Sequence, residues 1–286
     1  ACIKEVKDKL GYKKVVLAGW SGGGSLSLFY QSQAENPSLD STPAGDPPNL
    51  REANLPKADG LMLLAAHCSR ATTLTEWLDP SITDESQPNK RDKEFNLYDP
   101  LNPNQPPYSE DFIKEYRKKQ IERNKRITDW ALAKLESFRG DPTKEYGFAV
   151  HGTMADPRWL DPNQEPNDRK AGWCYLGDPK VVNDSPIGLS RFSSIRSWLS
   201  QFSYELSEAD GEKCGRSTSV PTLVIGNSAD DACPPSHNQR LYNSITHERR
   251  KLHIVKGANH YYFGQQEELA EAVNMSLDWL KEEDLI

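Results

Sequence analysis

The stretch that decides the fold is Val15-Val16-Leu17-Ala18-Gly19-Trp20-Ser21-Gly22-Gly23-Gly24, close to the start of the chain. Residues 13–19 are typical of a short buried strand, and residues 22–34 are typical of a helix. A serine between glycines at such a turn is the Gly-x-Ser-x-Gly nucleophile elbow, in which the hydroxyl projects from the sheet. The pattern predicts that Ser21 is a nucleophile. It also predicts that the amide of Gly22, at the helix N-terminus, stabilises an oxyanion.

The alternative interpretation of these glycines is a turn that binds phosphate. No Gly-Lys-Ser/Thr follows the turn, and the Gly-x-Gly-x-x-Gly spacing is absent. The strand before the serine and the helix after it favour the nucleophile elbow, since that motif is confirmed by this structural context.

Two later apolar runs end in the residues that a serine nucleophile needs. Val220-Pro221-Thr222-Leu223-Val224-Ile225-Gly226 is followed by Asp230 and Asp231, and Lys251-Leu252-His253-Ile254-Val255 is followed by a loop that contains His260. Serine, then an acid, then histidine is the chain order that accompanies the nucleophile elbow.

These three segments together resemble the C-terminal two-thirds of an α/β-hydrolase. The resemblance implies an α/β fold with a mostly parallel sheet, helices on both faces and a helical cap inserted between core strands. It also implies that Ser21 is the nucleophile, Asp230 the acid and His260 the base. In that family the acid usually stands four residues before the proline that opens the next helix, so Pro234 selects Asp230 over Asp231.

The resemblance also implies that the N-terminal strands of the fold are absent from this chain. In the family those strands precede the elbow and supply half of the oxyanion hole. Residues 3–11 look like the helix that directly precedes the nucleophile strand. Because a sheet without its early strands exposes an unpaired edge, we expect a missing segment or another chain to supply them. An oligomer is a further option.

The long insertion between the strands at 58–66 and 220–226 predicts a cap. We expect a first core segment at residues 1–66, the cap at 67–216 and a second core segment at 217–286. Within the cap, residues 109–139 and 188–206 have helical character, because apolar residues recur there at helical spacing.

Irregular, aromatic stretches in the cap suit a binding surface, as does the tryptophan of the elbow. The predicted substrate contacts are Trp20, Met154, Trp159 and Trp173. Four cap arginines are candidate partners of a substrate carboxylate, against a commoner solvated or paired role: Arg158, Arg169, Arg191 and Arg196. Of the histidines outside the predicted triad, His67 either lines the cleft or packs, and His151 is expected in the lid.

Composition narrows the class of partner. The chain has 286 residues, a net charge of −7 and no basic block, which argues against nucleic acid. No stretch approaches the ~20 apolar residues of a membrane span. Five widely spaced cysteines do not indicate a disulfide framework, so we expect a cytoplasmic location. Neither a His-Glu-x-x-His motif nor a Cys-x-x-Cys pair is present, so no metal or cofactor is expected.

The predicted function is hydrolysis of an ester, a lactone or a related acyl bond in a medium-sized organic substrate. The alternatives with the same three residues are an acyltransferase, an amidase, a thioesterase and a carbon–carbon bond hydrolase. A non-catalytic binding protein of the same fold is a further alternative. Dehalogenases and epoxide hydrolases of the family carry Asp at the elbow, so Ser21 argues against both.

Overall fold

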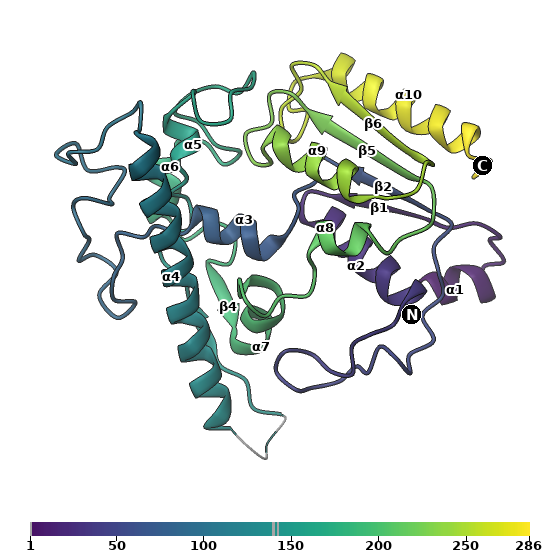
Figure 1. The fold of residues 1–286 in the computed structure, drawn as a ribbon, viewed down its shortest axis with the longest axis horizontal. Coiled ribbons are helices and arrows are strands. Elements are labelled where there is room, and N and C mark those ends of the chain that lie inside the picture. The colour runs from purple at the N-terminus through teal and green to yellow at the C-terminus, as the bar shows by residue number, and fades with distance from the viewer. Residues whose placement is uncertain (1, 139–140, 142) are drawn as a thin grey trace.

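The computed structural model describes residues 2–138, 141 and 143–286. Figure 1 shows a sheet flanked by helices, and beside it a second group of elements around one long helix, α4. The sheet and its helices contain both ends of the described chain, whereas the second group comes from the middle of the sequence.

The sheet has four parallel strands in the order β1-β2-β5-β6. Its strands are β1 (Val16–Trp20), β2 (Gly60–Leu64), β5 (Thr222–Asn227) and β6 (Arg250–Val255). These confirm the four predicted apolar strands. In the register, Gly19 lies opposite Leu63 and Leu63 lies opposite Val224. Because all four strands are parallel, the segments that follow β1, β5 and β6 meet at one edge of the sheet.

Helices cover both faces of this sheet (Figure 1). The core helices are α1 (Cys2–Asp8), α2 (Gly22–Glu35), α8 (Gly211–Gly215), α9 (Pro235–Ser244) and α10 (Gln266–Glu282). On one face Leu28 of α2 and Leu241 of α9 pack with Leu63. On the other face Trp279 of α10 packs with Leu223. The predicted α/β architecture, with helices on both faces of a parallel sheet, is therefore confirmed.

The strands differ in how well they are enclosed. All six residues of β5 are buried, as expected of a central parallel strand. By contrast, β1 is half-exposed along most of its length, and Ala18 is exposed. Among the described residues β1 pairs only with β2, so one edge of β1 is free.

The cap region contains helices and a small antiparallel sheet. Its elements are α3 (Arg70–Trp77), α4 (Glu110–Glu136), β3 (Gly147–Ala149), α5 (Pro157–Leu160), α6 (Pro179–Asp184), β4 (Phe192–Ser194), α7 (Ile195–Ser197) and the π-helix η1 (Trp198–Phe202). The helix predicted at 109–139 is confirmed as α4, which ends at Glu136, and residue 139 lies outside the described residues. The division of the chain at residues 66 and 216 stays a prediction, and Cys214 of α8 packs with Leu28 on the sheet side.

The continuous helix predicted at 188–206 is wrong. Phe192 begins β4, which pairs with β3, and its side chain is 76% exposed. Helical conformation begins only at Ile195, after Ser194, whose hydroxyl accepts a hydrogen bond from the Ser197 amide. The helical spacing of apolar residues holds for Ile195, Leu199 and Phe202, which are buried, and fails at Phe192 because strand pairing determines the backbone there.

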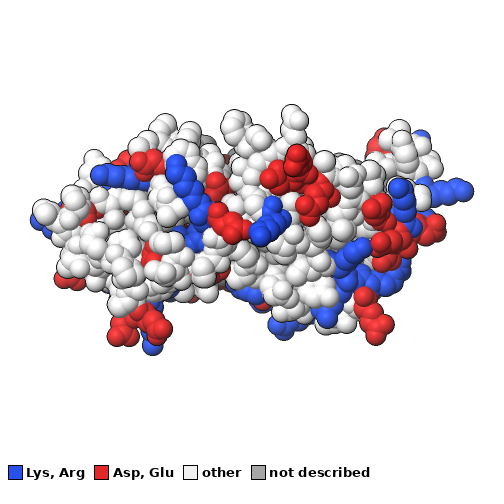
Figure 2. Space-filling view, turned by 90° about the horizontal axis from the view of Figure 1, so that it is seen from above, with Lys and Arg blue, Asp and Glu red and all other residues white. Residues whose placement is uncertain are grey.

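No helix in the described part of the chain is long and apolar enough to cross a membrane. The face seen in Figure 2 carries acidic and basic side chains close to one another rather than in separate blocks. This mixture agrees with the scattered charges of the sequence.

Candidate active site

Ser21 occupies a strained turn between β1 and α2. Its φ is 52° and its ψ is −119°, a conformation that non-glycine residues rarely adopt. The Ser21 amide donates to the Leu64 carbonyl at 2.9 Å, which ties the turn to the neighbouring strand. A Cβ on Gly19 would lie 2.3 Å from the Gly23 oxygen, and a Cβ on Gly24 would lie 2.4 Å from the Cβ of Ala66. The glycines are therefore required for close packing around the serine.

Asp230 and His260 form a buried pair at the same edge of the sheet. Nδ1 of His260 lies 3.1 and 3.0 Å from the two carboxylate oxygens of Asp230. Both residues are almost completely buried. The carboxylate also accepts hydrogen bonds from the amides of Ala232 at 2.8 Å and Cys233 at 2.6 Å. These amides fix the carboxylate so that it faces the imidazole.

Asp231 has a different environment from Asp230. Its main-chain carbonyl accepts hydrogen bonds from Trp159 Nε1 at 3.0 Å and from the Tyr175 amide at 3.2 Å. Burial, together with the nearby Asp230 charge, raises the pKa of the Asp231 carboxyl. Of the two neighbouring acids, the structure therefore places Asp230 against His260.

The Ser21 hydroxyl contacts the Cys233 thiol, with 3.8 Å between Oγ and Sγ. Within the described chain no hydrogen bond joins this hydroxyl to His260. Burial and the Asp230 charge raise the pKa of the Cys233 thiol well above its usual value, so the thiol is uncharged and weakly nucleophilic. The sequence does not predict a role for Cys233, and the one signal in the sequence is its position three residues after Asp230. Among the described residues, one group of side chains has the ligand types and the proximity that a metal ion needs, and it consists of Asp230, Cys233 and His260.

Aromatic rings enclose the His260 imidazole. Trp20 lies 6.0 Å away edge-on, and Tyr175 and Tyr261 approach with ring centroids at 6.0 and 4.7 Å. The sequence predicts Trp20 as a residue of the site, and it does not predict the two tyrosines. With these rings around it, the His260 side chain is almost completely buried.

The other predicted substrate contacts lie in different surroundings. Met154 and Trp159 are buried in an apolar cluster that includes Cys233. Trp173 is 41% exposed, with the Lys170 ammonium 4.4 Å from its ring centroid. Contact of these residues with a substrate stays a prediction.

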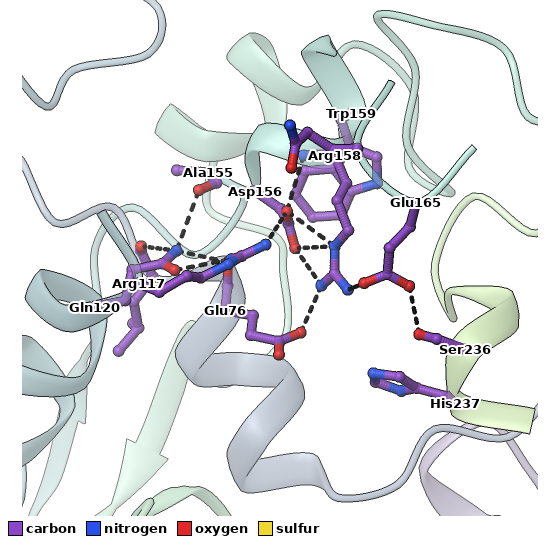
Figure 3. Close-up of polar contacts among 12 residues, drawn as sticks. Glu76, Arg117, Gln120, Ala155, Asp156, Arg158, Trp159, Glu165, Ser236 and His237 are labelled. Carbon is purple, nitrogen blue, oxygen red and sulfur yellow. Dashed lines mark hydrogen bonds and ion pairs between the residues drawn. The ribbon is translucent and has the colours of Figure 1, made fainter. Parts of the chain in front are cut away.

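An ionic cluster around the buried pair of Asp156 and Arg158 joins the cap to α9 (Figure 3). Arg158 pairs with Asp156 at 2.5 Å and with Glu165 at 2.9 Å, and Glu165 reaches Ser236 on α9. Burial opposes ionisation of Asp156, but Arg117 and Arg158 outweigh it and hold the pKa of that carboxyl well below its usual range. The cluster therefore stays charged and fastens the cap segment to α9.

The four arginines proposed as substrate partners all have partners within the protein. Besides Arg158, Arg169 donates to the Arg158 carbonyl at 2.7 Å and Arg196 donates to Asp46 at 2.7 Å. Arg191 donates to the Asn183 carbonyl at 3.0 Å. The commoner paired role is the one that the structure shows for these side chains.

His67 and Arg70 lie against the elbow at Gly22. A Cβ on Gly22 would lie 2.5 Å from Arg70 Nε and 3.1 Å from His67 Nε2. His67 is buried, and burial together with His237 and Arg70 lowers the pKa of its imidazole well below the usual value. His67 is therefore uncharged at neutral pH and packs directly against the elbow.

His237 is a second buried histidine, and its burial predicts how stability depends on pH. Its Nε2 lacks a hydrogen-bond partner among the described residues, and burial lowers its pKa to about 4. In the unfolded chain His237 binds a proton below about pH 6.5, whereas in the folded chain it binds one only below about pH 4. The contribution of His237 to the free energy of unfolding is therefore complete above about pH 6.5 and is lost as the pH falls toward 4. Between pH 7 and pH 5 the free energy of unfolding should fall by about 2 kcal/mol more in the wild type than in H237Q, as measured by urea titration. Equal losses in the two proteins would contradict the assignment.

No protein-family model and no curated protein sequence matches the chain. Among solved structures, the chain is similar to a monoacylglycerol lipase from Paleococcus ferrophilus, with a TM-score of 0.44 and 15% identity over 98% of this chain and 72% of that one. It is also similar to the α/β hydrolase GrgF from Penicillium sp. sh18, with a TM-score of 0.47 and 12% identity over 94% and 63% of the two chains. A third is the esterase domain of a Rhodothermus marinus protein, with a TM-score of 0.44 and 11% identity over 99% and 66%. The chain thus spans about two thirds of the length of these proteins.

The architecture of this chain is that of an α/β-hydrolase core. The elbow follows β1, the paired acid follows β5 and the histidine follows β6, all at one edge of a parallel sheet. The sequence predicts this fold class, which is an α/β fold with a parallel sheet and helices on both faces.

Proposed function

We propose that the protein is a serine hydrolase that cleaves an ester, a lactone or a related acyl bond. The observation that supports this best is the buried Asp230–His260 pair at the sheet edge where Ser21 holds a strained turn. A serine, a histidine and an acid that orients the histidine are the groups that acyl transfer needs.

In the proposed mechanism, Ser21 Oγ attacks the substrate carbonyl and its proton passes to His260 Nε2. Asp230 holds the proton on Nδ1 and stabilises the imidazolium that forms. The Gly22 amide, at the N-terminus of α2, donates to the oxyanion. The imidazolium then protonates the leaving alkoxide. In the second half of the reaction, His260 takes a proton from water, which attacks the acyl-enzyme. His260 then returns a proton to Ser21 Oγ as the acyl group leaves. Before attack, the hydroxyl turns from Cys233 toward His260, as catalytic hydrogen bonds often form only with substrate bound.

The proposed substrate is a medium-sized organic molecule in a reducing, cytoplasmic compartment. All five cysteines are free, and four of them are buried. Buried thiols of this kind persist where disulfides do not form. A screen of p-nitrophenyl esters of increasing acyl length would define the preferred acyl chain.

The free edge of β1 supports a second element of the proposal, which is that further strands complete the sheet. A groove of about 180 Å³ lies next to this region, lined by Trp20 and Leu64 and by apolar residues of α10. Three of these α10 residues are more than two-fifths exposed: Leu269, Val273 and Leu277. An unpaired strand beside an exposed apolar helix face fits one added strand and one added helix. The added segment would also supply the second oxyanion donor.

We expect residues 1–286 expressed alone to be insoluble or to have little activity. The exposed edge promotes association, and loss of one oxyanion donor costs about 10²–10³ in rate. Solubility, size-exclusion chromatography and esterase assays with and without a preceding segment, in cis or as a second chain, measure this. A soluble, monomeric and fully active product of residues 1–286 would show that the sheet needs no further strand.

A further inference from the structure

A cavity of about 460 Å³ opens beside the elbow. One wall is α2, which contributes Gly22, Leu26 and Phe29. A second wall is the loop between α2 and β2, and the cavity is also lined by Ser200, Gln201, Glu208 and Ala209. The loop wall consists largely of apolar side chains: Leu39, Pro43, Pro48 and Leu50. An apolar chain that entered this cavity would be stabilised because its surface is removed from water.

Arg70 supplies the cation of this cavity. Its guanidinium lies against Gly22, next to the nucleophile, and Nη1 donates to Gln201 Oε1 at 2.7 Å. Across the described part of the chain Arg70 forms no ion pair, whereas Arg158 and Arg196 each bind carboxylates. A guanidinium has five N–H donors in a fork that matches a carboxylate. Arg70 therefore has donors to offer a ligand.

Glu208 is the other charged residue that lines the cavity. Its carboxylate repels an anion, so one carboxylate near Arg70 is favoured and a second one near Glu208 is not. Gln201 belongs to the π-helix η1, a type of turn that is common at functional sites, and it holds the guanidinium from the cap side.

We propose that this cavity binds the apolar chain of a monocarboxylate, with the carboxylate on Arg70. If the protein is the proposed hydrolase, its acyl substrates carry a free carboxylate in addition to the bond that is cleaved. This consequence rests on the proposed function. Charge-assisted hydrogen bonds to a guanidinium give such substrates an advantage over uncharged ones of the same length.

The test is calorimetric titration of the 286-residue chain, with its completing segment where solubility requires it, using octanoate and octanamide. Octanoate should bind about tenfold more tightly than octanamide, since hydrogen bonds to a charged group are stronger than those between neutral groups. R70M should remove this preference and leave octanamide binding within about threefold, because its apolar contacts persist. E208Q should tighten octanoate binding.

The matched control is R249M, which removes a positive charge that pairs with Glu283 at the far end of α10. It should keep the preference for octanoate, so a change there would indicate an effect of net charge alone and would contradict the proposal. Equal binding of the two ligands to the wild type, no binding of either, or a preference that survives in R70M would also overturn it. Selective octanoate binding in a protein whose Ser21 is not labelled by a fluorophosphonate would refute the hydrolase proposal and leave this site standing.

Discussion

Replacing Ser21 with alanine should reduce esterase activity by about 10⁴-fold or more, because members of a catalytic triad act as a unit. The bond of the Ser21 amide to Leu64 uses only the main chain, so the turn should keep its shape in the variant. The effect is measured as initial rates of the wild type and S21A on the best p-nitrophenyl ester, and circular dichroism checks that both are folded. The assay uses residues 1–286 alone or with a preceding segment, according to which of the two hydrolyses the ester.

The control for this variant is S27A, which removes a hydroxyl from the same region of the chain. Ser27 lies on α2 beyond the first turn of the helix, so its side chain is not at the turn where the proposed attack occurs. The rate of S27A should therefore stay close to that of the wild type. An S21A protein within tenfold of the wild-type rate would show that the hydroxyl of Ser21 is not the nucleophile.

Replacing Asp230 with asparagine should lower the rate by about 10⁴-fold, the scale expected when the histidine is held in the wrong tautomer. The new side-chain amide would present a donor to Nδ1 of His260, in place of the carboxylate oxygen that now lies 3.0 Å from it. Steady-state kinetics of D230N give the size of this loss.

D231N is the matched control, since it makes the same chemical change one residue away. The contacts of Asp231 with Trp159 and Tyr175 use its main-chain carbonyl, which the substitution keeps. Its rate should therefore remain within about tenfold of the wild type, because no triad hydrogen bond is lost. If D231N were inactive and D230N active, the roles of the two acids would have to be exchanged.

The sheet and the elbow could be predicted because local sequence determines them. The apolar run before Ser21 forms β1, and the run before Asp230 forms β5. Gly19 and Gly24 are required by contacts within a few residues of the turn or with the segment that follows β2, so the motif itself carries the information. The chain order of acid and histidine follows from the order of the parallel strands.

The surroundings of the site could not be predicted, because they depend on contacts between distant segments. Cys233 meets Ser21, and Tyr175 meets His260, across long separations in the sequence. The sequence does not indicate Arg70, since a lone arginine after a strand has no pattern that distinguishes it from an arginine paired with buried acids. The helix predicted at Phe192 is wrong for a related reason, because pairing of β4 with β3 determines the backbone there despite the helical spacing of the apolar residues.

Fluorophosphonate labelling followed by mass spectrometry of the tryptic peptides tests most directly whether Ser21 is a nucleophile activated by His260. The proposal predicts one adduct, on Ser21, whose formation is lost in a His260→Ala variant because the hydroxyl then has no base. An adduct on another serine, or labelling of Ser21 that is equally fast without His260, would contradict the assignment of this chain as a serine hydrolase.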